Sequence, residues 1–205
     1  MSVLLIATTN AGKRREVETI LDGLAVELIG LDSLEPIDPP EETGKTFEDN
    51  ARLKACHYAR HTGHWTLADD SGLEVDALDG EPGVRSSRFA GPEASDDDNN
   101  RLLLARLRDV PPSQRTARFH CCAVLASPAG VAATAHGCVE GCILDHPRGE
   151  NGFGYDPIFF IESLGRTAAE LSAQEKNRIS HRGRAVRKLR PAIERFVLGG
   201  AGSGL

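Results

Sequence analysis

The chain has 205 residues, of which 40% are hydrophobic and 26% charged, and its formal net charge is -6. This length and apolar content predict a single domain over residues 1–198 with its own hydrophobic core, and residues 199–205 are expected to form a flexible tail. The negative charge and the lack of a basic stripe with interleaved aromatic residues exclude a nucleic acid polymer from the expected partners.

Hydropathy and cysteine content indicate the compartment. No segment approaches the roughly 20 consecutive apolar residues of a membrane span, and the apolar run that begins at Val3 shows no feature of a secretory signal. The five cysteines are an odd number for a disulfide framework, and Cys121 and Cys122 are adjacent. We therefore expect a cytoplasmic protein with free thiols and no membrane association.

The chain opens with a predicted strand-loop-helix unit. Residues 3–9 form a continuous run of strand formers, which is typical of a strand in the middle of a sheet that is covered on both faces. Asn10 can cap the helix that follows. The apolar face of this helix recurs at helical spacing, at Val17, Ile20, Leu21 and Leu24.

The remaining elements mix strand-type and helix-type patterns. We expect strands over residues 26–29, 65–68, 115–125, 131–139 and 157–161. We expect helices over residues 46–61, from residue 96 onward, and over residues 167–177 and 180–197. A turn is expected at residues 69–72 and a long surface loop at residues 79–92. Strand-helix units beside a hairpin predict an α/β fold with a mixed sheet flanked by helices.

Two pairs of adjacent acidic residues are candidates for chemistry. Asp69 and Asp70 directly follow a predicted strand, which delivers at least one carboxylate to the sheet edge where ligands of open α/β sheets usually bind. Glu41 and Glu42 follow a proline-rich stretch. Carboxylates on connecting segments suit Mg²⁺, which takes one or two of them with phosphate oxygens and water. An Asx turn and a solvated acidic turn are the structural alternatives.

Basic residues at the start of two predicted helices indicate an anion site. Residues 13–15 are Lys-Arg-Arg, and in a first helical turn each cation is unfavourable by roughly 0.3 to 1 kcal/mol. Backbone N–H groups after Asn10, the Lys13 ammonium and Thr8 could together bind phosphate, as helix N-termini often do. His181 and Arg182 repeat the pattern at the last helix. Exposed, solvated cations are the alternative.

A glycine-rich segment with two aromatic residues precedes the predicted strand at residues 157–161. In Gly152–Pro157, the rings of Phe153 and Tyr155 could stack on a base whose edge Asp156 reads, or they could pack in the core. The segment precedes a strand and has Pro157 where a dinucleotide fingerprint needs Gly or Ala, so a Rossmann cofactor site is not expected.

Two other familiar motifs are incomplete. Gly44-Lys45-Thr46 resembles the end of a P-loop, but Pro39 stands where that motif needs glycine. His57 and His61 have the spacing of a zinc-binding helix, but Tyr58 stands where its carboxylate belongs. We expect neither a Walker-type site nor zinc at these histidines.

Taken together, these segments resemble the Ham1 family of inosine/xanthosine triphosphate pyrophosphatases, which remove non-standard purine nucleotides. The similar segments extend over nearly the whole chain and are Thr8–Lys13, Glu42–Gly44, Thr46–Ala51, Ala68–Leu73, Pro82–Val84, Ser87–Gly91, Gly152–Pro157 and Ser180–Gly183. The resemblance implies an elongated mixed sheet with two lobes around a nucleotide-binding cleft, and a homodimer. It also implies Mg²⁺-dependent hydrolysis of ITP, dITP and XTP to a nucleoside monophosphate and pyrophosphate.

The resemblance also implies roles for individual positions. Asp70 would hold Mg²⁺ together with Glu41, for which Glu42 is a rival, and Asp70 would accept a proton from the attacking water. Asp69 would support it. Substrate-binding positions would be Thr8, Thr9, Asn10, Ala11, Gly12, Lys13, Lys54, Ser71, Phe153, Gly154, Tyr155, Asp156, Lys176, His181 and Arg182. Two alternatives stay open: a Maf-type pyrophosphatase of other nucleotide specificity, and a nucleotide-sensing module without turnover.

Overall fold

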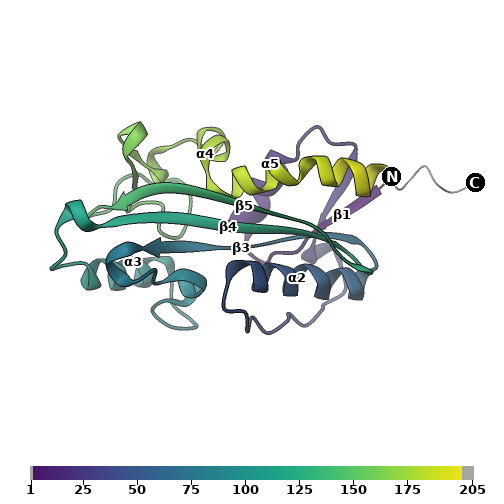
Figure 1. Cartoon of the computed structure of the whole chain (residues 1–205), viewed down its shortest axis with the longest axis horizontal. Coiled ribbons are helices and arrows are strands. Elements are labelled where there is room, and N and C mark those ends of the chain that lie inside the picture. The colour runs from purple at the N-terminus through teal and green to yellow at the C-terminus, as the bar shows by residue number, and fades with distance from the viewer. Residues whose placement is uncertain (1, 200–205) are drawn as a thin grey trace, which may run out of the picture. The chain divides into compact units, whose positions relative to one another are not determined.

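The computed structural model describes residues 2–199 (Figure 1), so the predicted tail lies outside the described residues except for Gly199. The strands are β1 (Ser2–Ile6), β2 (Val26–Gly30), β3 (Trp65–Val75), β4 (Thr116–Ser127), β5 (Gly130–Ile143), β6 (Phe159–Ile161) and β7 (Arg166–Thr167). The α-helices are α1 (Ala11–Ile20), α2 (Phe47–Thr62), α3 (Asp96–Arg106), α4 (Ala173–Ile179) and α5 (His181–Ile193). Among the described residues, no helix combines the length and the apolarity needed to cross a membrane.

The strands form one mixed sheet of seven, in the order β2-β1-β3-β4-β5-β6-β7. Strand β1 is parallel to both of its neighbours, β2 and β3, whereas β6 is antiparallel to β5 and β7. Strands β4 and β5 are neighbours joined by residues 128–129, which confirms the predicted hairpin. The α/β class and the inner position of the first strand are therefore confirmed.

The chain divides into two compact units, and strands β3, β4 and β5 contribute residues to both. Within the described chain, unit 1 comprises residues 2–70, 121–137 and 182–199, and unit 2 comprises residues 71–120 and 138–181. Each unit has its own apolar cluster. The single domain expected over residues 1–198 stays a prediction.

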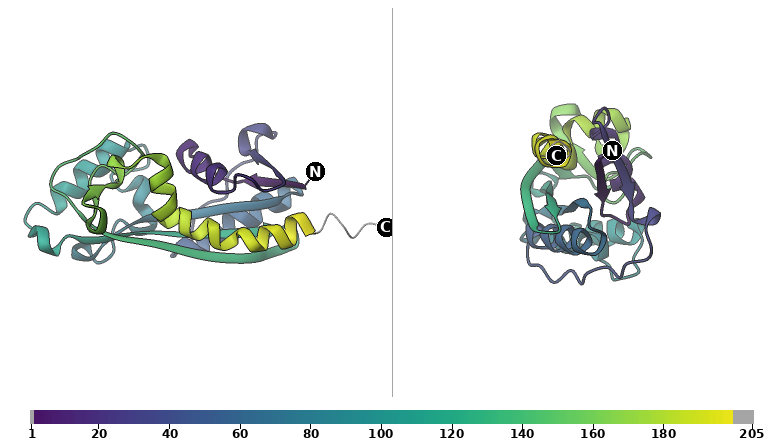
Figure 2. Two further views of the ribbon diagram at one scale, coloured as in Figure 1. Left: turned by 90° about the horizontal axis from the view of Figure 1, so that it is seen from above. Right: turned by 90° about the vertical axis from the view of Figure 1, so that its right-hand side faces the viewer.

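The core of unit 1 forms because its strands are covered on both faces. Helices α1 and α5 lie on one face and α2 lies on the other (Figures 1 and 2). In β1, Leu4 and Ile6 enter the cluster with α1 and α5, and alternation turns the buried Leu5 the other way. Other buried members of this cluster are Val17, Leu21, Leu67, Leu125, Val186, Leu189 and Ile193.

The core of unit 2 joins strand and loop residues with α3. Leu103 on α3 and Leu107, the residue that caps its C-terminus, are fully buried one turn apart. They share a cluster with Leu73, Val75, Phe119, Val139, Tyr155, Ile158, Phe159 and Leu171. The helix begins with a complete capping box, in which the Ser95 and Asp98 side chains bond each other's backbone N–H groups.

The predicted turn at residues 69–72 is wrong, because β3 continues without interruption from Trp65 to Val75. Adjacent acids and a Ser-Gly pair usually need solvent or a turn to satisfy them. Here Asp69 and Asp70 each have basic partners inside the fold, so the strand can carry both through the interior.

Two further segments differ from their predictions. The loop over residues 79–92 contains a 3₁₀ helix, η3 (Gly83–Arg88), whose buried Ser86 hydroxyl accepts a hydrogen bond from Leu73 N at 2.9 Å. The helix over residues 167–177 is divided into a short 3₁₀ turn and α4, because Ser172 and Glu175 form a capping box that starts a new helix.

Candidate active site

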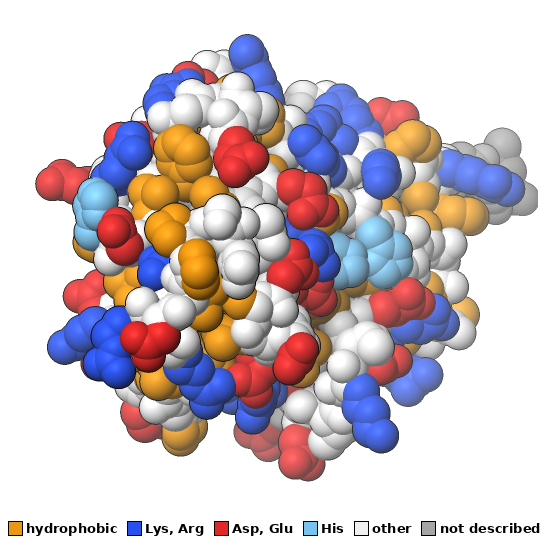
Figure 3. Space-filling model, turned by 60° about the vertical axis from the view of Figure 1, so that its left-hand side comes forward, with side chains coloured by type: hydrophobic (Ala, Val, Ile, Leu, Met, Phe, Trp, Pro, Cys, Tyr) orange, Lys and Arg blue, Asp and Glu red, His pale blue; other side chains and the backbone are white. Residues whose placement is uncertain are grey.

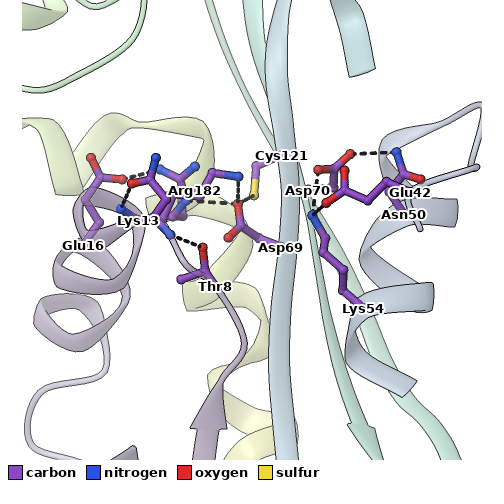
Figure 4. Close-up of polar contacts among 11 residues, drawn as sticks. Thr8, Lys13, Glu16, Glu42, Asn50, Lys54, Asp69, Asp70, Cys121 and Arg182 are labelled. Atoms are coloured by element: carbon purple, nitrogen blue, oxygen red, sulfur yellow. Dashed lines mark hydrogen bonds and ion pairs between the residues drawn. The ribbon is translucent and has the colours of Figure 1, made fainter. Parts of the chain in front are cut away.

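Strand β3 separates its two acidic residues onto opposite faces. Successive side chains of a strand point to opposite sides, and Figure 4 shows Asp69 directed toward Lys13 and Arg182, while Asp70 is directed toward Lys54. Both carboxylates are buried. The acidic pair therefore makes two different constellations, one on each side of the same strand.

The Asp69 constellation is a buried carboxylate shared by two cations. Its Oδ2 atom lies 3.3 Å from the Lys13 ammonium and 3.1 Å from Arg182 Nε, which donates a hydrogen bond. The Arg182 guanidinium, which is only 1% exposed, also pairs with Glu16 through Nη1. The Cys121 thiol donates to the same Asp69 oxygen at 3.9 Å. These contacts tie β3 to α1 and α5.

Electrostatics keep Asp69 charged. Burial alone would raise the pKa of the Asp69 carboxyl, but the charges of Lys13 and Arg182 outweigh burial and hold this pKa well below its usual range. Since Asp69 is ionised and fully engaged with cations, its geometry is that of a group that positions Lys13 and Arg182.

The loop before α1 has the local order expected of a helix-capping anion loop. Asn10 caps α1, and its Oδ1 atom accepts a hydrogen bond from Lys13 N at 2.9 Å. Thr8 Oγ1 accepts from Asn10 N at 3.2 Å. Arg14 is bound to Glu18 and Asp32, so within the first turn the Lys13 ammonium is the one that reaches the Asp69 constellation.

The other predicted positions near the start of α1 and on β3 differ in their exposure to solvent. Thr9 and Ala11 are exposed, Gly12 is half-buried in the first turn of α1, and that turn itself contains no acidic residue. Ser71 follows Asp70 on β3 and is half-buried. A helix start without an acidic residue of its own favours an anion at this loop.

The Asp70 constellation contains two carboxylates, one ammonium and one amide. Lys54 Nζ donates to Asp70 Oδ1 at 2.9 Å and lies 3.2 Å from Glu42 Oε1. Asn50 Nδ2 donates to the second Asp70 oxygen at 3.2 Å. Lys54 and Asn50 lie one turn apart on α2, so a single helix supplies both donors.

Burial raises the pKa of the Asp70 carboxyl above its usual range, although the charges of Lys54 and Lys13 oppose the rise. Burial would lower the pKa of the Lys54 ammonium, but Asp70 and Glu42 outweigh it and raise that pKa. The two neighbouring aspartates are thus shifted in opposite directions, which is the pattern expected when two acids have different tasks.

A close backbone approach fixes Asn50. Gly44 N donates to Asn50 Oδ1 at 2.8 Å, and this interaction orients the amide so that its nitrogen faces Asp70. A Cβ atom on Gly44 would lie 2.4 Å from the same Asn50 oxygen, so no larger residue fits without displacing it. The glycine is needed here for space.

The geometry favours Glu42 over Glu41 as the partner of Asp70. Glu42 reaches Lys54, whereas Glu41 is exposed. The carboxylates of Glu42 and Asp70 converge on a single ammonium, so the same oxygens can face a divalent cation. Hard oxygen ligands of this kind, few in number, suit Mg²⁺ when phosphate and water complete its shell. The residues present therefore fit the metal that the resemblance implies.

Unit 2 contains a pocket with an apolar wall and several polar groups. Its lining residues are Phe119, Val139, Asp156, Phe159, Ile161, Ala168, Lys176, Ile179, Ser180 and His181. The His181 ring stacks on Phe119, with ring centroids 4.8 Å apart and planes 13° apart.

A buried ion pair fixes the polar end of this pocket. Lys176 Nζ lies 2.5 Å from Asp156 Oδ2, which also accepts a hydrogen bond from Phe153 N at 2.9 Å. The Lys176 ammonium lies 4.6 Å from the centre of the Phe153 ring. Gly152 makes this possible, because a Cβ atom there would lie 2.0 Å from Asp156 Oδ2. The Asp156 carboxylate positions Lys176 and the Phe153 backbone.

Tyr155 and Gly154 support the segment in other ways. Tyr155 is buried in the core of unit 2, and its hydroxyl donates to Ser86 O at 2.8 Å. Gly154 N donates to Asp96 Oδ2, and Gly154 O accepts from Asn100 Nδ2 at 2.9 Å. Of the two aromatic rings in Gly152–Pro157, only Phe153 is partly accessible.

Sequence reasoning missed three residues of these constellations. Asn50 and Glu16 lie at helical positions that show no pattern distinct from an ordinary polar face, and Ser86 lies in the segment that was expected to be a surface loop. One signal was available for Asn50, which follows Thr46 by four residues and therefore lies on the first turn of a well-capped helix.

The charged surface is mixed in sign on the face drawn in Figure 3. Blue basic and red acidic side chains alternate there, with orange apolar side chains between them, and neither sign forms a continuous field on that face. That face therefore offers no continuous basic surface, and local groups such as Lys13 and Lys54 are the candidates for an anion site.

Comparison with known proteins finds relatives over nearly the whole chain. The profile of the Ham1 family matches residues 4–192. A protein of Exiguobacterium sp. named dITP/XTP pyrophosphatase is 55% identical over 198 residues, which are 96% of this chain and 99% of the relative. A protein of Geobacter sulfurreducens with the same name is 52% identical over 190 residues, which are 93% of this chain and 96% of the relative.

Solved structures agree with the sequence matches. A HAM1 protein from Coxiella burnetii superposes with a TM-score of 0.86 at 44% identity, covering 94% of this chain and 98% of that one. The Ham1 protein of Staphylococcus aureus superposes with a TM-score of 0.83 at 42% identity and the same coverage. These values confirm the mixed α/β fold.

Proposed function

Because the chain belongs to the Ham1 family, we propose that it hydrolyses non-standard purine nucleoside triphosphates to a nucleoside monophosphate and pyrophosphate. The observation that carries this proposal is the Asp70 constellation, in which a buried carboxylate with a raised pKa lies beside a second carboxylate and a lysine. Such a group can take a proton and still have charged partners that keep it in place. ITP, dITP and XTP are the expected substrates.

Asp70 is the proposed general base. Its carboxylate accepts the proton of a water molecule that attacks the α-phosphate, and the bond from that phosphorus to the bridging oxygen breaks, so that pyrophosphate leaves. Asn50 holds one Asp70 oxygen at 3.2 Å and Lys54 holds the other at 2.9 Å, which fixes the carboxylate plane. Lys54 also provides positive charge next to the base.

Glu42 and Asp70 are the residues that would hold Mg²⁺, with Glu42 replacing Glu41 in the proposed pair. When bound, the ion supplies charge neutralisation on the phosphate oxygens. The choice of Glu42 is supported by its contact with Lys54, the residue that also contacts Asp70.

The triphosphate is proposed to bind at the loop before α1. Free N–H groups of the first helical turn and the Lys13 ammonium are the donors, with Thr8, Thr9 and Asn10 at the same loop. Asp69 keeps Lys13 in place through an ion pair of 3.3 Å. Arg182 is a positioning residue in this proposal, because its guanidinium is buried between Asp69 and Glu16.

The purine base is proposed to bind in the pocket of unit 2. Lys176 lines this pocket and provides a donor for the 6-oxo group that hypoxanthine and xanthine share, and Phe153, whose ring lies beside the Lys176 ammonium, provides a surface for stacking. An amino group at that position, as in adenine, leaves the donor unpaired. Asp156 holds Lys176 at 2.5 Å, so the donor is fixed before the base arrives.

The proposal also covers the cellular compartment, the oligomeric state and the partners of the protein. All five cysteines are free thiols, which supports work in the reducing cytoplasm on the nucleotide pool. The family resemblance supports a homodimer. The ligand is a small nucleotide, with neither a nucleic acid polymer nor a membrane as partner.

A substrate panel tests the proposal. The pure protein is incubated with Mg²⁺ and ITP, XTP, dITP, ATP, GTP or dTTP, and the products are separated. We expect pyrophosphate and a monophosphate from the first three and little turnover of the others, and EDTA should stop the reaction. Release of orthophosphate, or equal turnover of ATP, would contradict the proposal. Preference for a pyrimidine nucleotide would favour a Maf-type activity. Binding of nucleotide without turnover would favour a sensing module.

A further inference from the structure

A second group of metal-binding side chains lies on the face of the sheet covered by α2. Among the residues that the structure describes, Glu48, Cys122 and His136 place a carboxylate oxygen, a sulfur and an imidazole nitrogen within 4.8 Å of one another. They come from α2, β4 and β5, and α2 lies far from the two strands in the sequence. All three belong to unit 1, so one compact body holds them.

We propose that Glu48, Cys122 and His136 form a binding site for Zn²⁺. Zinc prefers thiolate and imidazole ligands, whereas Mg²⁺ and Ca²⁺ prefer oxygen, so this ligand set selects against the metal of the Asp70 constellation. Three protein ligands leave a fourth tetrahedral position for water. The proposal does not depend on the nucleotide activity.

Neighbouring groups already orient the ligands. Arg52 Nη1 donates to Glu48 Oε1 at 3.1 Å, which leaves Oε2 to face His136 Nε2 at 3.3 Å. The backbone carbonyl of His136 accepts a hydrogen bond from Lys188 Nζ at 2.7 Å. The Arg52 bond orients the Glu48 carboxylate, as hydrogen bonds to the side chains of metal ligands do, and the Lys188 bond anchors the backbone of His136.

Cys122 supplies the soft ligand from the inner side of the site. It follows Cys121 on β4, and because Cys121 contacts Asp69 on one face, Cys122 points to the opposite face. Burial raises the pKa of the Cys122 thiol to about 12, so the metal must displace a proton when it binds. The side chains of Glu48 and His136 are 38% and 46% exposed, which gives the ion a route from solvent.

Binding here would join the first turn of α2 to β4 and β5. The same helix carries Asn50 and Lys54, the residues that hold Asp70. Zinc is therefore expected to raise the thermal unfolding midpoint of the protein, because a ligand that binds only the folded state stabilises it.

Cobalt titration tests the site. The metal-free protein is titrated with Co²⁺, whose near-ultraviolet thiolate charge-transfer band reports a Co–S bond, and Zn²⁺ is then added. We expect a band that saturates at one equivalent and disappears with Zn²⁺. In C122S the band should be lost, and in E48Q and H136Q the affinity should fall at least about tenfold. C138S and H57Q are matched controls and should behave as the wild type.

The variants separate a site from an accidental grouping. E48Q and H136Q change partly exposed side chains and carry the test if C122S does not fold. The proposal is overturned if wild type shows no thiolate band, if the band survives in C122S, or if E48Q and H136Q both bind Co²⁺ with unchanged affinity. In those cases the group is an ordinary surface ion pair beside a buried thiol.

Discussion

At the scale of single residues, the direction in which a side chain points decides its task. Asp69 and Asp70 are neighbours in sequence and chemically identical, but alternation along β3 gives them different partners and opposite pKa shifts. The sequence shows both acids and Lys13, because their types and local context are visible there. It cannot show which acid meets which lysine, since Lys54 approaches from a helix 16 residues away.

The glutamate that holds Mg²⁺ can be identified by comparing two matched variants. We expect Glu42→Gln to raise the Mg²⁺ concentration needed for half-maximal hydrolysis at least about tenfold. Removing even a group that hydrogen-bonds a metal ligand lowers metal affinity by about this factor, and removing a ligand itself should lower it at least as much. Glu41→Gln should leave it unchanged, since Glu41 is exposed and Glu42 makes the contact with Lys54. Magnesium titrations of both variants on dITP measure this, and the opposite ranking would return the role to Glu41.

At the scale of elements, the starts of helices can be predicted from local residues, whereas features that depend on long-range contacts cannot. Asn10 caps α1 as predicted, and Thr46 and Ser95 cap α2 and α3 close to the starts expected for these helices, because a cap needs only residues three positions apart. The turn expected at residues 69–72 fails because partners from other elements satisfy both acids. Such partners have no local signature.

Gly44, in the loop before α2, is expected to affect the proposed general base Asp70 through Asn50. Gly44→Ala places a methyl group against Asn50 Oδ1 and should destabilise the fold by about 1–3 kcal/mol, as overpacking does. It should also lower kcat, because Asn50 then loses its hold on Asp70. Unfolding in urea and steady-state kinetics measure both effects. Lys45→Ala, at an exposed neighbour, is the control, and full activity in Gly44→Ala would argue against a positioning role for Asn50.

The start of α4 is expected to respond to acid. The Ser172 backbone N–H, Arg166 and the Ser172 hydroxyl lower the pKa of Glu175 to about 2 from the model-peptide value of 4.5. A depressed folded-state pKa gives stability that is present above pH 4.5 and is lost as the pH falls toward 2. Glu175→Gln should therefore be less stable than wild type at pH 7, and the difference should shrink at pH 3. A constant difference in thermal midpoint would contradict this origin.

At the scale of the whole molecule, the fold class could be predicted from the sequence and the pairing of distant residues could not. Strand and helix periodicity is enough to predict a mixed α/β sheet, and the sequence motifs are enough to indicate the Ham1 family. Lys176 with Asp156, and Glu48 with Cys122 and His136, come together only through the folded chain.

The proposed homodimer has a direct test. With a chain of 22.0 kDa, light scattering of the purified protein should give about twice this mass over a tenfold range of concentration. A monomer throughout that range would contradict the assembly while leaving the site proposals unaffected, because the Asp69, Asp70 and pocket constellations are each formed within one chain.

We propose that Asp69 on one face of β3 positions cations and that Asp70 on the other face acts as the base, and measurements of kcat and stability for two matched variants distinguish these roles. Asp70→Asn should lower kcat on dITP by about 10²- to 10⁴-fold with the fold intact, because Lys54 keeps Glu42 as partner. Asp69→Asn should lose about 3–5 kcal/mol of stability, because Lys13 and Arg182 lose their shared carboxylate. Full turnover in Asp70→Asn, with turnover lost in a stable Asp69→Asn, would contradict this division and assign the base to Asp69.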